Sequence, residues 1–534
     1  MTDSAGPGRR SRAVAPLVLL VAAYTALLAA WVVTNPPGAA PDEVNHYLRA
    51  LAVGRGDVVG RPNPELGDPP DMAPPPKSAG TDALRSSWVA RGARLVRVPG
   101  GVGPTDGFAC EGFDPTRTSR CQAGFTADPA DADRLTTMGT VEPVPYLLPG
   151  LSTRLARGPV SGLLLARAAG AVLAALLLAG AAAVLWSWSD VALAGLAVAV
   201  TPMVVFVGSA LSGSGMEVAA AVCFFAAVLG IGLGPTGGRR TWAIAGASGA
   251  ALASSRSLGP VWVLAGVAVV LAAVGVRPFW DKARAAGRWA AGAAAAVALA
   301  TVGTVAWEVA HQPGVDFDGA LFRRQLGPGV GTLRGAGREA IGVFGNLDSH
   351  LPGSVYVLWT VLLVALVGAA LVAGTNRQRA VLVALVAALP GTAVLVSAGI
   401  MGQNGFGLQG RHVLPFATLL PLFAGSVLAA NSGALGRFVR RWALAAVAVP
   451  AAVVQGVAWY ANARRYAVGS RGPVVFFGAS EWSPPGGWEA WAVVVVLAVA
   501  AGVAAAVTAA RPVATPAPAP LGSRAPTGRL PARR

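Results

Sequence analysis

The residues best suited to chemistry lie in one stretch, Pro41 to Gly56, directly after the first long apolar run of the chain. The stretch reads as a helix with proline at its first position and with Asp42 and Glu43 in its first turn, where the helix dipole favours negative charge. Asp42, His46 and Arg49 follow at the i, i+4, i+7 spacing of one helical face. A carboxylate, an imidazole and a guanidinium so placed can take a proton from a hydroxyl group and hold an anionic leaving group. The alternative is that the acids only cap a helix.

The composition of the 534-residue chain is that of a polytopic membrane protein. Hydrophobic residues make up 54% of the sequence and charged residues 13%, with a mean hydropathy of +0.57, which excludes an ordinary soluble protein. The net charge of +17 comes almost wholly from arginine. A positive balance of this kind is typical of cytoplasmic loops and lipid contacts, so we expect no nucleic-acid partner. The sequence contains no phosphate-cradling G-x-x-x-x-G-K-[ST], CxxC or HExxH motif.

Apolar runs of roughly spanning length predict an all-α integral membrane protein with about 12 transmembrane helices. The first run, 13–34, is longer than a signal-peptide core and predicts an uncleaved helix that follows a cytoplasmic N-terminus, 1–12. The polar segment 35–158 is then a long extracytoplasmic loop, 159–510 the transmembrane bundle, and 511–534 a disordered cytoplasmic tail. The later runs lie near 160–186, 191–210, 215–233, 241–255, 258–276, 289–309, 353–374, 380–399, 412–430, 442–460 and 488–510. The short run at 241–255 has the alternative of being half of a broken pair.

The distribution of basic residues agrees with this threading. Every short basic loop assigned to the cytoplasm obeys the positive-inside rule. This favours an even number of helices, with both termini on the cytoplasmic side of the plasma membrane of a bacterium. The residues in these loops are Arg239, Arg240, Arg277, Lys282, Arg284, Arg288, Arg377, Arg379, Arg437, Arg440 and Arg441.

A second set of arginines falls on the extracytoplasmic side, at or near helix ends. For each of them, snorkelling to lipid headgroups is the alternative to ligand binding. Their gathering on the side of the acidic pair points to a shared anionic ligand, and a lipid phosphate is the obvious candidate. The set comprises Arg256, Arg323, Arg324, Arg334, Arg338, Arg411, Arg464, Arg465 and Arg471.

Further polar residues are expected at the same face. Glu217, at the top of an apolar helix, needs a partner, and Arg256 is a plausible one; the alternative is an acid stabilised by its helix dipole. Asp348 precedes a predicted helix and either binds a ligand or serves as an N-cap. Gln409 and Arg411 enter another helix beside glycines that permit a phosphate or a sugar to approach the backbone, although a simple loop also fits.

Two cysteines, Cys110 and Cys121, fall in the long loop. If that loop is extracytoplasmic, a disulfide between them is a reasonable hypothesis, and two unpaired thiols are the alternative. The four histidines are scattered, which argues against a site built from histidine alone.

The order of these motifs resembles a known family. PDEVNHYLRALAVGRG, SGSGMEVAAA, SSRSLGPVW, VFGNLDSHLP, QGRHVLP and EWSPPGGW together look like the bacterial predicted membrane proteins of domain of unknown function 2142, over about 16–507. That family in turn resembles the GT-C superfamily of membrane glycosyltransferases, which take a sugar from a polyprenyl-phosphate carrier. The resemblance implies a GT-C-like helical bundle.

The superfamily keeps an acidic pair in its first extracytoplasmic loop. By that resemblance Asp42 is the catalytic base and Glu43 a second carboxylate that assists it or binds a divalent cation, Mg or Mn, together with Asp42. His46 completes the catalytic candidates, although neither His46 nor Arg49 has a settled role in the superfamily. The segment PVPYLLPG, 143–150, is expected to lie on the membrane surface.

The expected reaction is an inverting transfer in which Asp42 deprotonates an acceptor hydroxyl of a cell-envelope polysaccharide or protein. Arginines would hold the leaving polyprenyl phosphate, Arg411 first and Arg256, Arg464 and Arg465 behind it. Arg49, Glu217, Asp348 and Gln409 complete the candidates for substrate binding. The rival reading is a transporter or flippase of lipid-linked sugars or cell-envelope polysaccharide, and a third is a scaffold. A carrier should line a path through the bilayer with charges and often contains repeats, whereas here the polar residues gather at one face.

Overall fold

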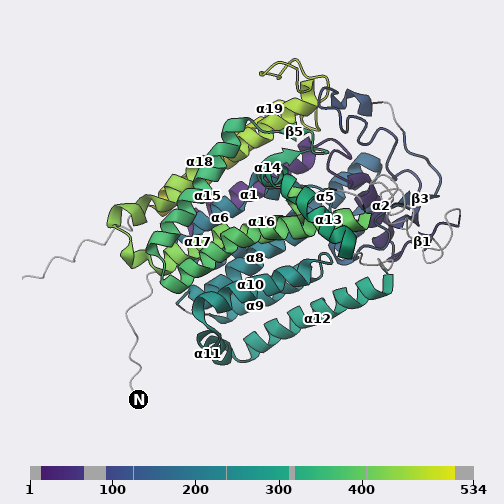
Figure 1. Cartoon of the computed structure of the whole chain (residues 1–534). Coiled ribbons are helices and arrows are strands. Elements are labelled where there is room, and N and C mark those ends of the chain that lie inside the picture. The colour runs from purple at the N-terminus through teal and green to yellow at the C-terminus, as the bar shows by residue number, and fades with distance from the viewer. Residues whose placement is uncertain are drawn as a thin grey trace, which may run out of the picture.

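Long apolar helices packed side by side make up most of the computed structural model (Figure 1). It describes residues 14–64, 89, 92–123, 126–235, 237–311, 319–404 and 407–510, so the expected cytoplasmic N-terminus 1–12 and tail 511–534 lie outside the described residues. Within the described part, nine helices are long and apolar enough to cross a membrane. They are α1 (Ala15–Thr34), α5 (Pro159–Trp186), α8 (Gly213–Leu233), α12 (Arg288–His311), α15 (Gly353–Ala373), α16 (Asn376–Asn404), α17 (Gly410–Ala430), α18 (Arg437–Val468) and α19 (Gly487–Ala509).

Two bent helix pairs raise the number of spans in the described residues to as many as 11. The pair α6 (Ala192–Ala199) and α7 (Pro202–Ser209) bends by 63°, and the pair α10 (Gly259–Val274) and α11 (Val276–Ala286) bends by 110°. Thr201 and Pro202 explain the first break, because the threonine side chain caps the new helix and proline suits its first position. The remaining apolar run forms α9 (Arg239–Ala253), whose 15 residues are short for a span. All expected runs are therefore helical, and the all-α polytopic fold is confirmed.

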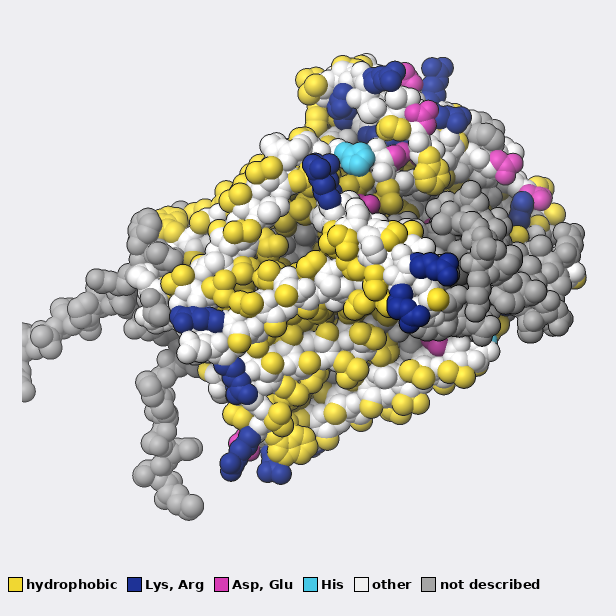
Figure 2. Space-filling view, viewed as in Figure 1, with side chains coloured by type: hydrophobic (Ala, Val, Ile, Leu, Met, Phe, Trp, Pro, Cys, Tyr) yellow, Lys and Arg dark blue, Asp and Glu magenta, His cyan; other side chains and the backbone are white. Residues whose placement is uncertain are grey.

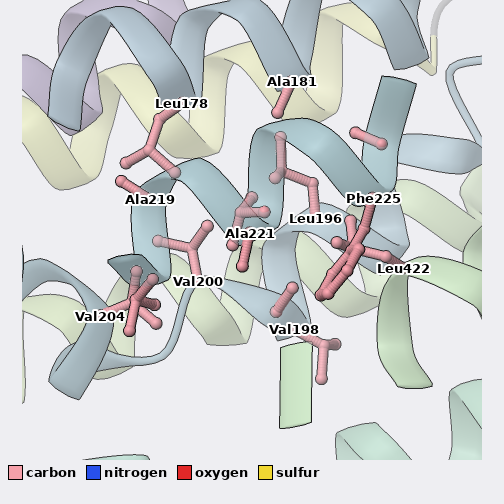
Figure 3. Packing of buried hydrophobic residues seen from close by; sticks show 14 of the residues in the cluster. Leu178, Ala181, Leu196, Val198, Val200, Val204, Ala219, Ala221, Phe225 and Leu422 are labelled. Atoms are coloured by element: carbon pink, nitrogen blue, oxygen red, sulfur yellow. The ribbon is translucent and has the colours of Figure 1, made fainter. Parts of the chain in front are cut away.

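The core of the bundle is built around α8 and α17. In each of these helices 89% of the apolar 18-residue stretch that could span a membrane is buried. The corresponding share is 17% in α12, which lies at the edge of the bundle (Figure 1). Figure 3 shows large side chains such as Leu196, Phe225 and Leu422 packed among small ones such as Ala221. The small side chains let the central helices approach closely. A Cβ atom on Gly195 of α6 would lie 2.5 Å from the carbonyl oxygen of Pro421 in α17, so glycine is required at that crossing.

The segment after α1 folds into a compact module at one end of the bundle. It contains α2 (Glu43–Val53), α4 (Val144–Ser152) and an antiparallel sheet of β1 (Arg61–Pro62), β2 (Arg94–Val98) and β3 (Ala132–Thr136) in that order. Tyr47, Leu51, Val96 and Tyr146 form its small core. The module also contains a disulfide bond between Cys110 and Cys121, which confirms the pairing expected from the sequence.

The bundle's outer surface divides into apolar and charged zones. Figure 2 shows mostly hydrophobic side chains along the helices, with lysine and arginine gathered toward the two ends. Beyond α12, two short helices, α13 (Gly319–Gly331) and α14 (Leu333–Gly342), lead into a hairpin of β4 (Val343–Phe344) and β5 (Ser349–His350). This hairpin and α14 border the site described next.

Candidate functional site

Asp42 and Arg411 meet where the N-termini of α2 and α17 come together. Nη2 of Arg411 lies 2.6 Å from Oδ2 of Asp42, and Nη1 donates to the carbonyl oxygen of Pro41 at 3.2 Å. The Asp42 side chain is 46% exposed and that of Arg411 only 10%, so solvent reaches the carboxylate over a largely buried guanidinium. These two candidates, 369 residues apart in the sequence, are brought into direct contact by the fold.

The backbone of Asp42 corrects the expected start of the helix. Its φ of 61° is left-handed, which makes Asp42 the N-cap of α2 and places Pro41 outside the helix. A non-glycine residue in this conformation is strained, and such strain is frequent at functional sites. The Asp42 side chain makes no capping bond to the helix, so its carboxylate is directed to Arg411.

Charge governs the ionisation of Asp42. Burial raises its pKa, but the positive charges of Arg411 and Arg256 outweigh burial and hold the pKa below its usual value. The carboxylate is therefore ionised at neutral pH, which is the state required of a base.

His46 lies one turn further along α2 and is buried. Its Nδ1 is hydrogen-bonded to the hydroxyl of Tyr146 in α4 at 2.7 Å, and the two rings stack with centroids 5.8 Å apart. Burial lowers the pKa of His46 to about 3 despite the opposing effect of Asp42, so the imidazole is neutral at physiological pH. The sequence did not single out the Tyr146 side chain.

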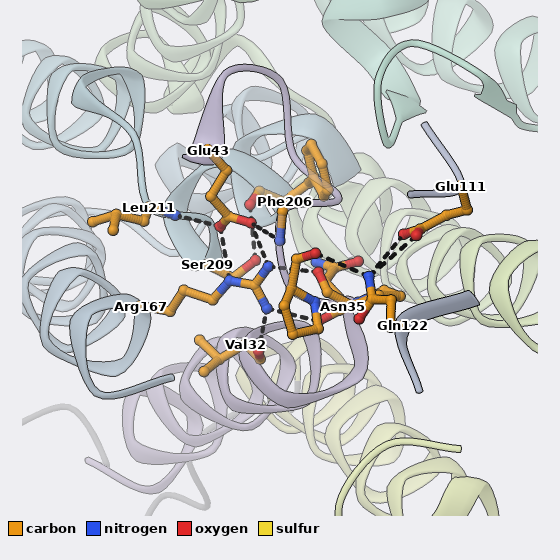
Figure 4. Close-up of polar contacts among 12 residues, drawn as sticks. Val32, Asn35, Glu43, Glu111, Gln122, Arg167, Phe206, Ser209 and Leu211 are labelled. Atoms are coloured by element: carbon orange, nitrogen blue, oxygen red, sulfur yellow. Dashed lines mark hydrogen bonds and ion pairs between the residues drawn. The ribbon is translucent and has the colours of Figure 1, made fainter. Parts of the chain in front are cut away.

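Glu43, in contrast, is part of a fully buried ion pair with Arg167 of α5 (Figure 4). Its Oε1 accepts from Nε of Arg167 at 2.7 Å and from the backbone N–H of Leu211 at 3.0 Å, and its Oε2 accepts from Nη2 of Arg167 and from the backbone N–H of Gly38. Arg167 also donates to the carbonyl oxygens of Val32, Asn35 and Pro36. The pair therefore joins α1, α2, α5 and the turn before α8. Arg167 was not among the residues predicted from the sequence. A single arginine within an apolar run nevertheless indicates a paired or functional residue.

The residues predicted to hold a divalent cation do not fit one. Both oxygens of Glu43 are filled by protein donors, and its side chain is 0% exposed. Asp42 is paired with Arg411, whose positive charge would repel a metal ion at the same place. Asp42 and Glu43 as arranged here therefore do not form a site for a divalent cation.

Glu217 and Arg256 form the pair expected from the sequence, with Oε2 and Nη1 4.0 Å apart. Glu217 is buried in α8 and accepts a hydrogen bond from Nε1 of Trp262 at 3.0 Å, while Arg256 donates to Oγ of Ser214 at 2.9 Å. Arg256 remains 37% exposed and is close enough to Asp42 to lower the pKa of that carboxyl. It therefore stays with Arg411 as a candidate for binding an anion.

Four other candidates have structural partners that occupy their charged groups. Asp348 and Arg465 form a buried ion pair at 2.6 Å, and Arg465 also reaches backbone carbonyls of the disulfide loop. Arg464 binds carbonyl oxygens of the loop after α18. Arg49 is 0% exposed and donates to the carbonyl oxygens of Gly139, at 3.0 Å, and Val141. We assign these four residues to holding the loops and leave them out of the ligand site.

A narrow cavity with room for about one water molecule adjoins Arg411. Gln409, the N-cap of α17, lines it together with Glu339 of α14 and Phe206 of α7. Glu339 accepts from the backbone N–H of Gly410 at 2.6 Å, so a protein carboxylate already occupies this helix N-terminus. A Cβ atom on Gly410 would lie 2.6 Å from backbone atoms of α14, which explains the glycine beside Arg411.

The comparisons with known proteins give one match. A family model described as a predicted membrane protein, DUF2142, matches residues 26–420. No curated protein and no solved structure matches the chain. The matched range contains Asp42, His46, Arg256 and Arg411, and it ends before α18 and α19.

Proposed function

The chain belongs to the DUF2142 family of predicted membrane proteins, and we propose that it is a membrane glycosyltransferase of the GT-C type. In this proposal it moves a sugar from a polyprenyl-phosphate carrier to a polysaccharide or protein of the bacterial cell envelope. The observation that carries the proposal is the contact between the half-exposed carboxylate of Asp42 and the guanidinium of Arg411. The two groups are those needed to accept a proton and to hold a phosphate.

The distribution of basic residues supports an orientation in which the site lies on the extracytoplasmic side of the membrane. Basic residues of α11 and of the first turn of α9 lie at the cytoplasmic side in the threading, so the module after α1 faces the extracytoplasmic side. There the lipid phosphate of a carrier in the outer leaflet lies at the depth of the helix ends that carry Arg256 and Arg411.

The proposed chemistry is a single displacement. Asp42 takes the proton of the acceptor hydroxyl as the hydroxyl oxygen bonds to the anomeric carbon of the sugar. The bond between that carbon and the phosphate oxygen breaks, and the polyprenyl phosphate leaves with the electron pair. Arg411, with Arg256 beside it, stabilises the charge that develops on the phosphate. The activated phosphodiester supplies the driving force, so no nucleotide is consumed.

Donor binding would also activate the base. With Arg411 in contact, the pKa of Asp42 lies below its usual value and the carboxylate is a weak base. A phosphate competes for the same guanidinium, which binds phosphate oxygens in a bidentate manner. Once Arg411 turns to the phosphate, burial is no longer opposed by the ion pair and the pKa of Asp42 rises. The base would gain strength only when a donor is present.

The experiment for this proposal compares Arg411→Gln with wild type in proteoliposomes that contain a panel of polyprenyl-phosphate sugars. We expect a higher KM for the donor lipid and a lower kcat. The phosphate loses the guanidinium that binds it, and Asp42 loses the group that controls its pKa. Arg471→Gln, an exposed arginine of the loop after α18, is the matched control and should behave as wild type. An unchanged donor KM in Arg411→Gln would overturn the assignment, and movement of lipid-linked sugar across the bilayer without transfer would support the rival carrier function.

A further inference from the structure

A short helix, α11, turns out of line with the bundle at the end opposite to the module after α1 (Figure 1). α10 is apolar and packs beside α8 and α9, and the chain bends by 110° between α10 and α11. Charged side chains are frequent in the 11 residues of α11, namely Arg277, Asp281, Lys282 and Arg284. The interior of a bilayer does not tolerate such a density of charge. The bend therefore directs α11 along the membrane surface.

One face of α11 is fastened to the ends of neighbouring helices. Nζ of Lys282 donates to three carbonyl oxygens at the C-terminal end of α8, at 2.8–2.9 Å. Carbonyl groups of a last helical turn have no partner within their own helix, so the ammonium group satisfies them. Phe279 packs against Trp242 of α9, with ring centroids 6.0 Å apart. These contacts fix the orientation of α11, and the charge of Lys282 is used in holding it.

The side of α11 that faces away from these contacts combines apolar and basic groups. Val276 and Trp280 lie one turn apart and are 69% and 55% exposed. The guanidinium group of Arg284 lies over the indole ring of Trp280, 5.5 Å from its centroid. Arg277 lies two turns before Arg284 on the same side of the helix, and both arginines are exposed. We call these four residues the α11 surface.

Further basic groups surround the α11 surface. At the start of α12, Arg288 lies over the ring of Trp289, 5.7 Å from its centroid. Arg377, near the start of α16, is exposed, and its Nη1 would be 3.0 Å from a Cβ atom on Gly275, directly before α11. Asp281 is the one acidic residue in α11 and the first turn of α12. Figure 2 shows basic and hydrophobic side chains side by side at this end of the bundle.

We propose that the α11 surface binds anionic lipid headgroups in the leaflet at this end of the bundle, which is the cytoplasmic leaflet in the orientation given above. Arg277 and Arg284 hold the lipid phosphate, because a guanidinium group donates to two of its oxygens at once. The contact with Trp280 restricts Arg284 before a lipid binds. Trp280 and Val276 enter the boundary between headgroups and acyl chains, the depth at which tryptophan is enriched in membrane proteins. This position favours a lipid over a soluble partner, and the proposal is independent of the transferase function.

The test is quenching of a fluorophore on Val276→Cys in the full-length protein, reconstituted in an equal mixture of phosphatidylglycerol and phosphatidylcholine. One lipid at a time carries brominated acyl chains. The native cysteines are disulfide-bonded or buried, so the label attaches at the new position. We expect stronger quenching by brominated phosphatidylglycerol, from a local enrichment of about fivefold for each arginine. The double variant Arg277→Gln/Arg284→Gln should lose this preference. The matched control, Arg120→Gln/Arg471→Gln, removes the same charge from exposed loops at the other end and should keep it.

A charge-preserving variant separates lost binding from lost folding. Arg277→Lys/Arg284→Lys keeps both positive charges and removes the planar guanidinium groups, so its preference should lie between those of wild type and the glutamine variant. All proteins are compared as equal amounts of monodisperse protein after size-exclusion chromatography. Equal quenching by the two lipids in the parent protein would overturn the proposal, as would weak quenching by both. A preference that persists in the glutamine variant, or that the control loses to the same extent, would likewise overturn it.

Discussion

Adjacent carboxylates, Asp42 and Glu43, have opposite environments. Asp42 is half-exposed and faces a single arginine, whereas Glu43 is enclosed and accepts from four protein donors. The left-handed backbone at Asp42 separates the two side chains, so one points to the site and the other into the bundle. The pair of acids therefore divides into an exposed candidate for chemistry and an enclosed structural residue.

Replacing Glu43 by Gln should destabilise the fold. Removing one partner of a buried ion pair leaves the other charge uncompensated, and such losses amount to about 3–5 kcal/mol. We expect a lower thermal unfolding temperature in detergent than for wild type or for Glu489→Gln, which changes an exposed acid in the first turn of α19. Adding Arg167→Met to Glu43→Gln should recover only part of the loss, because the carbonyl oxygens of Val32, Asn35 and Pro36 then lose their donor. A Glu43→Gln protein as stable as wild type but without activity would instead return Glu43 to the catalytic residues.

The buried imidazole of His46 makes stability depend on pH. Its pKa is about 3 in the folded protein and about 6.5 in the unfolded chain, so between these values the unfolded state binds the extra proton. The stability contributed by neutral His46 is complete above pH 6.5 and falls with pH by about 1.4 kcal/mol per unit. We expect the unfolding temperature of wild type to fall more steeply between pH 7 and pH 5 than that of His46→Asn. Parallel curves would show that His46 titrates normally in the fold.

At the scale of elements, α4 has one face in the module and one face exposed. Tyr146 points inward to His46, while Leu147, Leu148, Leu151 and, just beyond the helix, Leu155 are 45–75% exposed. A helix with such an exposed leucine side suits the membrane interface, as the family resemblance implied. It would connect the bilayer surface to His46 through a single side chain.

The depth of α4 is measurable with a fluorophore on Leu151→Cys. Brominated lipids should quench this label strongly, because the leucine side of α4 enters the headgroup and acyl boundary. A label on Ala130→Cys, an exposed position before β3, should be quenched much less. Equal quenching at both positions would mean that α4 stands away from the bilayer.

The sequence predicted elements more reliably than it predicted contacts. Each apolar run became helical, although the run 191–210 is broken into α6 and α7, because hydrophobic length is a local property. Cys110 and Cys121 form a disulfide within the same loop. The partner of Glu43 is 124 residues away, and only the packing of α5 against α1 and α2 places it there. Asp348 and Arg465 were expected to bind a ligand, but the fold brings them to each other. Charge and helix-end position alone do not distinguish these outcomes.

In the molecule as a whole, the proposed site lies at one end of the bundle. Asp42 and Arg411 meet where the module after α1 contacts α17. The module thus brings an acidic group to a helix end from a distant part of the chain. This arrangement favours chemistry at the membrane surface over a charged path through the bilayer.

The most direct test of the account is transfer of radiolabelled sugar from polyprenyl-phosphate donors by purified protein in liposomes, with wild type beside Asp42→Asn. The substitution keeps the shape of the side chain and removes the base, so we expect turnover to fall by about 10²–10⁴-fold while the protein still folds and binds donor lipid. Transfer by Asp42→Asn at the wild-type rate would contradict the assignment of Asp42. Binding or flipping of the lipid without transfer, equal in both proteins, would contradict the glycosyltransferase function itself.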